Sequence, residues 1–383
     1  MDGAGALLQH LRDGVPRTRS ELAAATGLGR STVAQRVDAL LASALVGAAG
    51  EATSTGGRPP TQFAFNPSAR VVLAADVGAT HVRLAVTDLA ATVLATELVD
   101  LDIARGPQAV LGWIVANGRR LVAATGHQPA ELAGVGIGLP GPVEHATGRP
   151  TNPPIMPGWD GFDVPAFVRT GLGAIVVVDN DVNVMALGEH HTGFRDVDHL
   201  MFVKVATGIG SGIISDGALR RGAQGAAGDL GHIQVPHDVD ARCRCGNVGC
   251  LEAVASGAAI AGRLRAAGVS ATSSQDVVDL ARSGSVLANQ LLRDAGRTIG
   301  EVLASAVSLL NPSVIVIGGT VAEAGDPLLA GVREIVYRRS LPLATSELRI
   351  VQAAVGDRSG VVGAAVMVID QVLAPDAVDV YVG

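Results

Sequence analysis

The sequence VVLAADVGATHVRLAV, residues 71–86, combines two short strands with a tight turn between them. Its first part, Val71–Ala75, is continuously apolar, which indicates a buried strand. The turn runs from Asp76 to Thr80 and contains a glycine. Beyond it, apolar residues alternate as in a strand with one buried face: Val82, Leu84 and Val86. A third strand at residues 93–101 would complete an antiparallel meander.

The same arrangement recurs in the sequence LMFVKVATGIGSGIIS, residues 200–215. Each turn offers backbone amides and a hydroxyl that can bind a phosphate. Glycine- and threonine-rich turns also close plain hairpins, so either turn alone is a weak signal. Two such units, followed by the apolar strand and glycine pair of Ile315–Gly319, predict a duplicated α/β body. Its two lobes, of the actin-like or ribonuclease-H-like kind, would face each other across a cleft.

The composition fits a large folded protein. A chain of 383 residues suggests two or three domains. Only 17% of the residues are charged and 48% are hydrophobic, which excludes a disordered chain. The net charge of −7 and the 3% of aromatic residues exclude a generally basic binder and an aromatic base-stacking platform. A small DNA-reading module attached to an acidic body remains compatible with these numbers.

Neither a membrane span nor a secretory leader is expected. The uncharged stretch from Val302 to Ala322 contains Asn311-Pro312 and a glycine pair, so it predicts a buried helix, a turn and a strand. The N-terminus lacks the basic start and apolar run of a signal peptide. The three cysteines lie within eight residues and cannot all pair. These features favour a cytoplasmic, reducing location.

The first 66 residues form a separate unit that has the pattern of a helix-turn-helix. The spacing of Thr18 and Glu21 is that of a capping box at the start of a short helix, which ends near Gly27. From Ser31 a further helix places apolar residues on one face. Its other face carries the side chains that could reach base edges or phosphates in a major groove: Ser31, Thr32, Gln35 and Arg36.

The segment from Gly50 to Pro60 predicts a hairpin or wing that presents Arg58 to DNA. Residues 1–66 contain six arginines against five acidic residues, whereas the rest of the chain is acidic. DNA binding is the favoured interpretation of this unit, and a helical protein-interaction module is the alternative.

The strongest catalytic candidate is Asp181, which follows the apolar run Val176–Val178. A carboxylate at the end of a buried strand, at a lobe boundary, can accept a proton from a sugar hydroxyl that attacks a phosphoryl group. The alternative is that Asp179 and Asp181 merely end a strand and cap a helix.

The cysteines predict a metal site. His232, Cys243, Cys245 and Cys250 offer one imidazole and three thiolates, the ligand set of a closed tetrahedral zinc site. Such a site is structural, because no open position remains for chemistry. Three incidental reduced thiols are the alternative.

These motifs together resemble the ROK family of repressors, open reading frames and kinases. The resemblance begins with Ser20–Leu22, Gly27-Leu28 and Ser31–Val33, and continues through the wing sequence Ser54–Pro59. It extends over almost the whole chain and includes the segment CRCGNVGCLE, residues 243–252. The resemblance implies a winged helix-turn-helix fused to a sugar-kinase-like body.

The resemblance also implies ligand roles. The two turns and the downstream glycine pair would bind a nucleotide through Asp76, Gly78, Thr80, Thr207, Gly208, Gly210, Gly318 and Gly319. The sugar would be bound by Gly141, Asn180, Asp181, Asp229, His232 and Glu252. Asp181 would be the catalytic base if the body is a kinase. His232 would place one ring nitrogen on zinc and turn the other towards the ligand.

Three residues depart from the pattern of the active kinases: Ala79 replaces a glycine, His81 a lysine and Asp229 a glutamate. Ala79 would crowd backbone that must approach a phosphate closely. The shorter side chain of Asp229 withdraws its carboxylate by about 1.5 Å. These departures weaken the expectation of ATP and Mg²⁺ binding, which applies only if the body is kinase-active.

The sequence therefore predicts three units: residues 1–66, a first lobe at 67–182 completed by 361–383, and a second lobe at 183–360 with the zinc site. The favoured function is a DNA-binding transcriptional regulator, a repressor, whose body binds a sugar or sugar phosphate. Its partners would be double-stranded operator DNA and a second copy, as a homodimer or a dimer of dimers. The alternative is an ATP-dependent hexose or N-acetylhexosamine kinase, or a chain with both activities.

Overall fold

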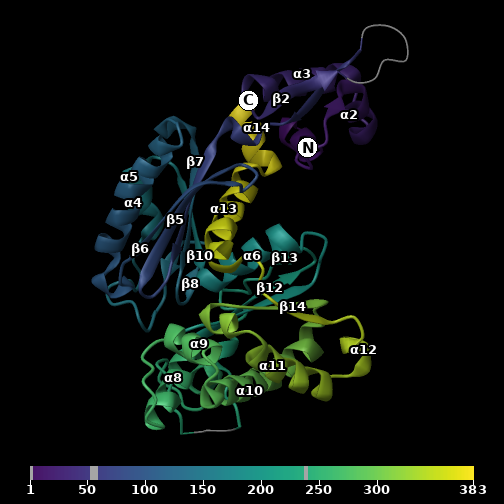
Figure 1. Ribbon diagram of the computed structural model, residues 1–383. Helices are drawn as coiled ribbons and strands as arrows, with labels where there is room; N and C mark the ends of the chain where they lie inside the picture. The colour runs from purple at the N-terminus through teal and green to yellow at the C-terminus, as the bar shows by residue number, and fades with distance from the viewer. Residues whose placement is uncertain (1–2, 52–58, 237–239) are drawn as a thin grey trace.

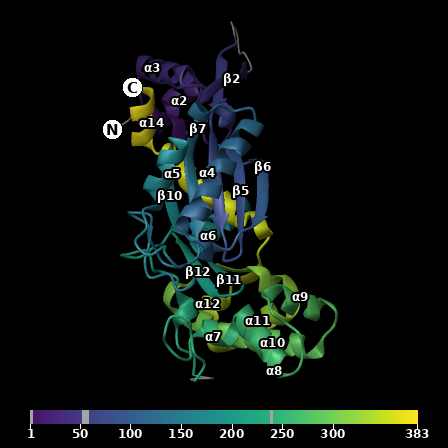
Figure 2. The same ribbon diagram turned by 90° about the vertical axis from the view of Figure 1, so that its left-hand side faces the viewer.

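The structure is a computed structural model, and it describes residues 3–51, 59–236 and 240–383 (Figure 1). The predicted strand–turn–strand units both form, one in each lobe of a two-lobed body. A small head made from the N-terminal residues lies at one end of this body (Figures 1 and 2).

The head is a winged helix. In chain order its elements are α1 (Ala4–Gln9), β1 (Arg17–Thr18), α2 (Arg19–Thr26), α3 (Arg30–Ala42), β2 (Val46–Glu51) and β3 (Thr61–Phe65). Thr18 and Glu21 form the predicted capping box, and Gly27 ends α2 in the left-handed conformation. Strands β2 and β3 pair antiparallel as the base of the wing. Arg58, which the sequence predicts to contact DNA, lies outside the described residues.

The first lobe contains a five-stranded sheet. Its strands are β4 (Val71–Val77), β5 (His81–Asp88), β6 (Val93–Asp100), β7 (Leu132–Leu139) and β10 (Ile175–Asn180). Their order is β10-β7-β4-β5-β6, in which β5 alone runs antiparallel to both of its neighbours. Helices α4 (Pro107–Ala124) and α5 (Val164–Leu172) cover one face, and the hairpin β8 (Val143–Glu144) and β9 (Arg149–Pro150) lies near the cleft.

The second lobe repeats this topology. Its strands are β11 (Leu200–Val205), β12 (Ile209–Ser215), β13 (Ala218–Leu219), β14 (Val314–Gly318) and β15 (Arg349–Gln352), in the order β13-β12-β11-β14-β15. The outer face packs on α10 (Val286–Leu310) and α11 (Asp326–Arg339). The smaller helices are α7 (Leu251–Ala255), α8 (Gly257–Ala266), α9 (Ser274–Arg282) and α12 (Pro342–Thr345). The predicted helix, turn and strand at 302–322 are thus the end of α10, a left-handed Asn311 and β14.

Two helices, α6 (Asp181–Gly193) and α13 (Ser359–Val372), pack against each other between the sheets. Glycines make their close crossing possible. A Cβ atom at Gly363 would lie 1.6 Å from the carbonyl oxygen of Val184, and one at Gly188 would lie 2.0 Å from that of Ser359. Since any side chain at these positions would collide with backbone, the crossing requires glycine.

The end of the chain connects the body to the head. Helix α13 packs on β4 and β7, whereas α14 (Pro375–Val382) packs on α1 and α3 (Figure 1). The Gly5 amide donates to Asp379 Oδ1 at 2.7 Å, and Gln9 Nε2 donates to the Leu373 carbonyl at 2.7 Å. Residues 361–383 therefore divide between the first lobe and the head. In the described residues, no single helix could span a membrane; the bent pair Gly356–Val372 and Pro375–Val382 meets the criteria of length and composition only.

Candidate functional site

The predicted ligand residues gather in one cleft between the lobes. The cavity has a volume of about 710 Å³. It is lined by all the residues predicted to bind nucleotide: Asp76, Gly78, Thr80, Thr207, Gly208, Gly210, Gly318 and Gly319. It is also lined by all those predicted to bind sugar: Gly141, Asn180, Asp181, Asp229, His232 and Glu252. Residues from both halves of the chain therefore meet at one site, as the duplicated fold requires.

Asp181 and Asn180 lie where strand β10 passes into helix α6. Asn180 is the N-cap residue: its Oδ1 accepts from the Val182 amide at 2.9 Å, and its Nδ2 donates to the Gly141 carbonyl at 2.9 Å. Asp181 is the first residue of the helix and is 5% exposed. The alternative that Asp179 and Asp181 end a strand and cap a helix named the wrong cap, because the cap is Asn180, and Asp181 lines the cavity.

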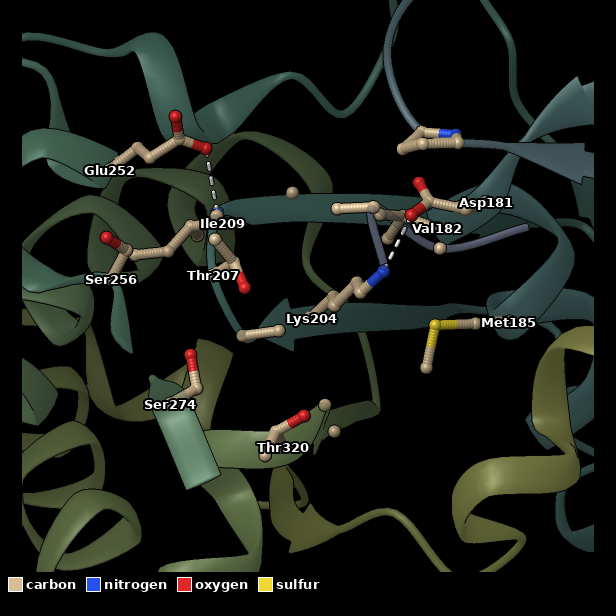
Figure 3. A pocket seen from close by; sticks show the side chains of 18 of the residues that line it. Asp181, Val182, Met185, Lys204, Thr207, Ile209, Glu252, Ser256, Ser274 and Thr320 are labelled. Carbon is tan, nitrogen blue, oxygen red and sulfur yellow. Dashed lines mark hydrogen bonds and ion pairs between the residues drawn. The ribbon is translucent and has the colours of Figure 1, made fainter. Parts of the chain in front are cut away.

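Lys204 is a cleft residue that sequence reasoning missed. It lies on β11 of the second lobe, and its Nζ donates to Asp181 Oδ2 at 2.6 Å (Figure 3). It is the one charged residue in the otherwise apolar strand LMFVKV, residues 200–205. That isolated charge was the available signal, because a lysine in a buried strand needs a partner.

The electrostatics of the cleft depend on this lysine. Burial raises the pKa of Asp76 to about 6, against a lowering by the Lys204 charge, and Asp181 raises it further. Burial acts to lower the pKa of Lys204, but Asp181 and Asp76 together raise that pKa above its usual value. Lys204 therefore carries an ammonium group at neutral pH, and its charge acts on both carboxylates.

The first turn is partly covered by its own neighbours. The His81 ring lies against Gly78, where an added Cβ would be 2.6 Å from Cε1, and the Gly78 amide donates to the His81 carbonyl at 2.8 Å. Burial and the charge of Lys204 lower the pKa of His81, so its imidazole is neutral at pH 7. The Gly78 amide is therefore already hydrogen-bonded, and position 81 carries no positive charge that could bind a phosphate.

The second turn carries a carboxylate. Glu252 Oε2 accepts from the Ile209 amide at 3.0 Å, and a Cβ at Gly208 would lie 2.4 Å from the same oxygen (Figure 3). An anion held against this turn disfavours a phosphate there, because like charges repel. Gly319 also has a packing role, since a Cβ there would lie 2.7 Å from the Val205 carbonyl oxygen.

His232 lies between the cleft and the cysteine cluster. Its Nδ1 is 3.6 Å from Cys243 Sγ, and its Nε2 is 3.9 Å from Asp229 Oδ1. One ring nitrogen therefore faces the cysteines, and the other faces a carboxylate that lines the cavity.

The cysteine cluster has the dimensions of a tetrahedral metal site. Ligand atoms of His232, Cys243, Cys245 and Cys250 all lie within 4.8 Å of one another. The sulfurs of Cys245 and Cys250 are 3.7 Å apart. Bond lengths of about 2.3 Å to sulfur and 2.05 Å to nitrogen predict edges of about 3.8 Å and 3.6 Å in a zinc tetrahedron. The spacing of these four residues therefore suits a bound metal.

Asp179 has a separate, structural role. It is 1% exposed and accepts hydrogen bonds from Asn183 Nδ2 at 2.8 Å and from Arg221 Nε at 2.6 Å. Arg221 comes from the second lobe, so this ion pair joins the two lobes beside the cleft.

The predicted DNA face lies on α3. Ser31 and Gln35 are exposed, and Thr32 and Arg36 are half-buried. Arg36 Nη1 is buried and has no hydrogen-bond partner among the described residues, so this arginine is less available than the sequence suggested. Arg30, the first residue of α3, is exposed and was missed.

A winged helix joined to a duplicated, two-lobed body with a cleft and a His/Cys cluster defines a class of protein: a DNA-binding head on a sugar-kinase-like body. The ROK family matches residues 72–371, and the chain belongs to this family.

Two similar regulators match this chain over almost its whole length. The chain is 27% identical to the xylose repressor of Bacillus spizizenii, over 96% of this chain and 94% of that one. Its fold matches a crystal structure of a ROK family transcriptional regulator, a homologue of the Escherichia coli MLC protein, with a TM-score of 0.84, 27% identity and coverage of 99% and 98%. A ROK family glucokinase from Streptomyces griseus, in complex with glucose and AMPPNP, matches with a TM-score of 0.67 and 29% identity, over 78% of this chain and 98% of that one. The glucokinase match thus leaves about a fifth of this chain uncovered.

Proposed function

We propose that this protein is a sugar-responsive transcriptional repressor. Its winged-helix head binds operator DNA, and its cleft binds a sugar that changes the affinity for DNA. The observation that carries this proposal is the path of α13 and α14: α13 begins at the cleft, where Ser359 lines the cavity, and α14 holds α1 of the head. The whole-length similarity to a xylose repressor supports the same function.

A second copy of the chain completes the DNA-binding unit. One winged helix contacts a single half-site, which rarely gives enough affinity, and a twofold pair reads a palindrome. A homodimer, or a dimer of dimers, would place two α3 helices in successive major grooves. We place this regulator in the cytoplasm, with the DNA that it binds.

The test begins by selecting bound sequences from a random duplex library and measuring their affinity by gel shift, with and without a panel of sugars and sugar phosphates. We expect one enriched palindrome whose complex is weakened by a subset of the sugars.

Variants of α3 test the DNA face. Gln35→Ala and Arg30→Ala should each weaken DNA binding by about 1–3 kcal/mol. Arg30→Ala should also reduce the slope of log affinity against log salt concentration by about 1. Arg338→Ala, an exposed arginine on α11 of the body, is the matched control. No enriched sequence, or equal effects of Arg30→Ala and Arg338→Ala, would contradict the proposal.

We propose zinc as the metal of the cysteine cluster. Three thiolates and an imidazole suit zinc better than harder cations, and the site holds together η4 (Leu230–His232) and the loop before α7. Zinc on Nδ1 of His232 would leave Nε2 to donate towards Asp229 and the sugar. The metal would thus be structural and would also orient a ligand-binding ring.

The second candidate is an ATP-dependent sugar kinase. It is favoured by the positions of Asp181, Thr207 and Gly210 in the cleft, and by the similarity to a glucokinase solved with glucose and AMPPNP. A coupled assay of ADP release across hexoses and N-acetylhexosamines tests it. Sugar-dependent turnover that is lost in Asp181→Asn would establish this activity, and a flat panel would exclude it for those sugars.

A further inference from the structure

Lys204 places an ammonium group beside the carboxylate of Asp181, the predicted catalytic base. In such sites, carboxylates hold a metal ion that neutralises the charge of the transferred phosphoryl group. Here Asp76 of the first lobe and Asp181 at the start of α6 line the same cavity. The Lys204 ammonium, from the second lobe, lies 2.6 Å from Asp181 Oδ2, and its charge also acts on Asp76.

Both carboxylates lie on packed elements of the molecule. Asp181 lies in the first turn of α6 and is 5% exposed. Asp76 lies against the N-terminal end of α13, where a Cβ at Gly360 would be 2.2 Å from Asp76 Oδ2. Lys204 is the penultimate residue of β11, and its side chain is 24% exposed. All three groups therefore lie on packed elements, and the ammonium forms part of the cleft.

A divalent ion would have to compete with this charge directly. A cation bound to Asp181 within coordination distance would lie a few ångströms from the ammonium, and at the low dielectric of a cleft this repulsion is severe. The phosphate turns are also covered, by the Glu252 carboxylate at Gly208 and by the His81 ring at Gly78. The residues present therefore do not suit the binding of Mg²⁺ together with a nucleoside triphosphate.

We propose that Lys204 is a built-in counter-ion for Asp76 and Asp181 that replaces the divalent cation, so that the cleft binds its sugar without metal or nucleotide. This proposal rests on the proposed function as a sugar sensor. It assigns Asp181 the role of a hydrogen-bond acceptor for a sugar hydroxyl, because its second oxygen remains free of Lys204.

Manganese provides a direct probe, because bound and free Mn²⁺ differ in their electron paramagnetic resonance spectra. We expect wild type to leave Mn²⁺ free, and Lys204→Met to bind one Mn²⁺ per chain at least about tenfold more tightly. Lys204→Arg, which keeps the positive charge, should behave like wild type. Adding Asp181→Asn to Lys204→Met should abolish the gained site. Zinc content, measured before and after each titration, separates the cleft from the cysteine cluster.

Two results would overturn the proposal: wild-type binding of Mn²⁺ that is lost in Asp181→Asn, or a folded Lys204→Met that gains no site. Lys204→Thr serves as a second neutral replacement if Lys204→Met does not fold. The titration of wild type with Mn²⁺ tests the proposal even if neither variant folds. The selection of operator DNA, made on the same wild-type preparation, keeps the two proposals apart. Absence of DNA binding would contradict the proposed function as a regulator, but it would leave the manganese results unaffected.

Discussion

The carboxylate of Asp181 and the ammonium of Lys204 are 2.6 Å apart, although 23 residues of sequence separate them. Sequence patterns predicted that Asp181 lies in the cleft, because it follows an apolar strand. They could not predict its partner, since that contact depends on how the two lobes face each other. Glu252 is a similar case: it lines the predicted cavity, but its hydrogen bond to the Ile209 amide is set by the position of α7.

The stability of the Asp181–Lys204 pair can be measured by a double-mutant cycle. Asp181→Asn leaves the mostly buried ammonium without its carboxylate partner, so we expect a loss of about 1–3 kcal/mol in the free energy of unfolding, the cost of a buried donor left unsatisfied. Lys204→Met alone should also destabilise, because two carboxylates then repel each other. The double variant should recover most of the loss, as measured by urea denaturation. Additive losses would show that the pair has no energetic coupling.

Asp76 predicts a dependence of stability on pH. Burial raises its folded pKa from 3.8 to about 6, so the folded protein keeps this proton to higher pH than the unfolded chain does. The free energy of unfolding should therefore fall by about 1–3 kcal/mol as the pH rises from about 4 to 6, and then level off. Asp76→Asn should remove this component when denaturation curves of the two proteins are compared. The same slope in both proteins would contradict the assignment.

At the scale of elements, local signals predicted the helices and strands well. The capping box at Thr18, the break at Asn311 and the alternating strand after the first turn all form as predicted. These features depend on a few neighbouring residues and backbone sterics. The sequence did not indicate that α14 leaves the body and packs on the head, because an amphipathic helix does not specify which apolar surface it will cover.

The attachment of α14 to the head can be weakened at one hydrogen bond. Asp379→Ala removes the acceptor of the Gly5 amide, which lies at 2.7 Å. We expect looser docking of the head and a several-fold loss of operator affinity, with sugar affinity unchanged, by gel shift and calorimetry. Asp376→Ala, an exposed carboxylate in the same helix, is the control. A parallel loss of sugar affinity would indicate general destabilisation instead.

The cysteine cluster should hold one zinc ion per chain. Cys245→Ser removes a thiolate, so the zinc content measured by mass spectrometry should fall towards zero. Sugar affinity should fall as well, because His232 then loses the metal that orients its ring. Full retention of zinc in Cys245→Ser would contradict the proposed ligand set. Ser283→Ala, at an exposed position after α9, serves as the control and should keep its zinc.

At the scale of the whole molecule, the duplicated topology was predictable because both strand–turn–strand units are local in sequence. The arrangement of head, lobes and cleft arises from contacts between distant segments, such as the Arg221–Asp179 ion pair. Those contacts leave no periodic trace in a single sequence. The sequence therefore predicted which residues lie together in the cleft. It did not predict which hydrogen bonds and ion pairs they make there.

If the cleft and the head are coupled, their affinities must change reciprocally. A sugar that weakens operator binding by a given factor must itself bind more weakly, by the same factor, to the DNA complex. We expect that factor to be about 5–150-fold, the usual range of allosteric coupling. Calorimetric titration of the sugar into free protein and into the DNA complex measures it. Equal sugar affinities in both titrations would rule out coupling.

The contact between Gly5 and Asp379 has a consequence for how the protein is made. These residues are 374 positions apart, so their hydrogen bond forms only after the ribosome has added the whole intervening chain. The head can fold early, since its helices and wing are contiguous in sequence. Its contact with α14 forms only when that helix has been made. A chain that ends before α14 would therefore carry the helices of the head without this attachment to the body.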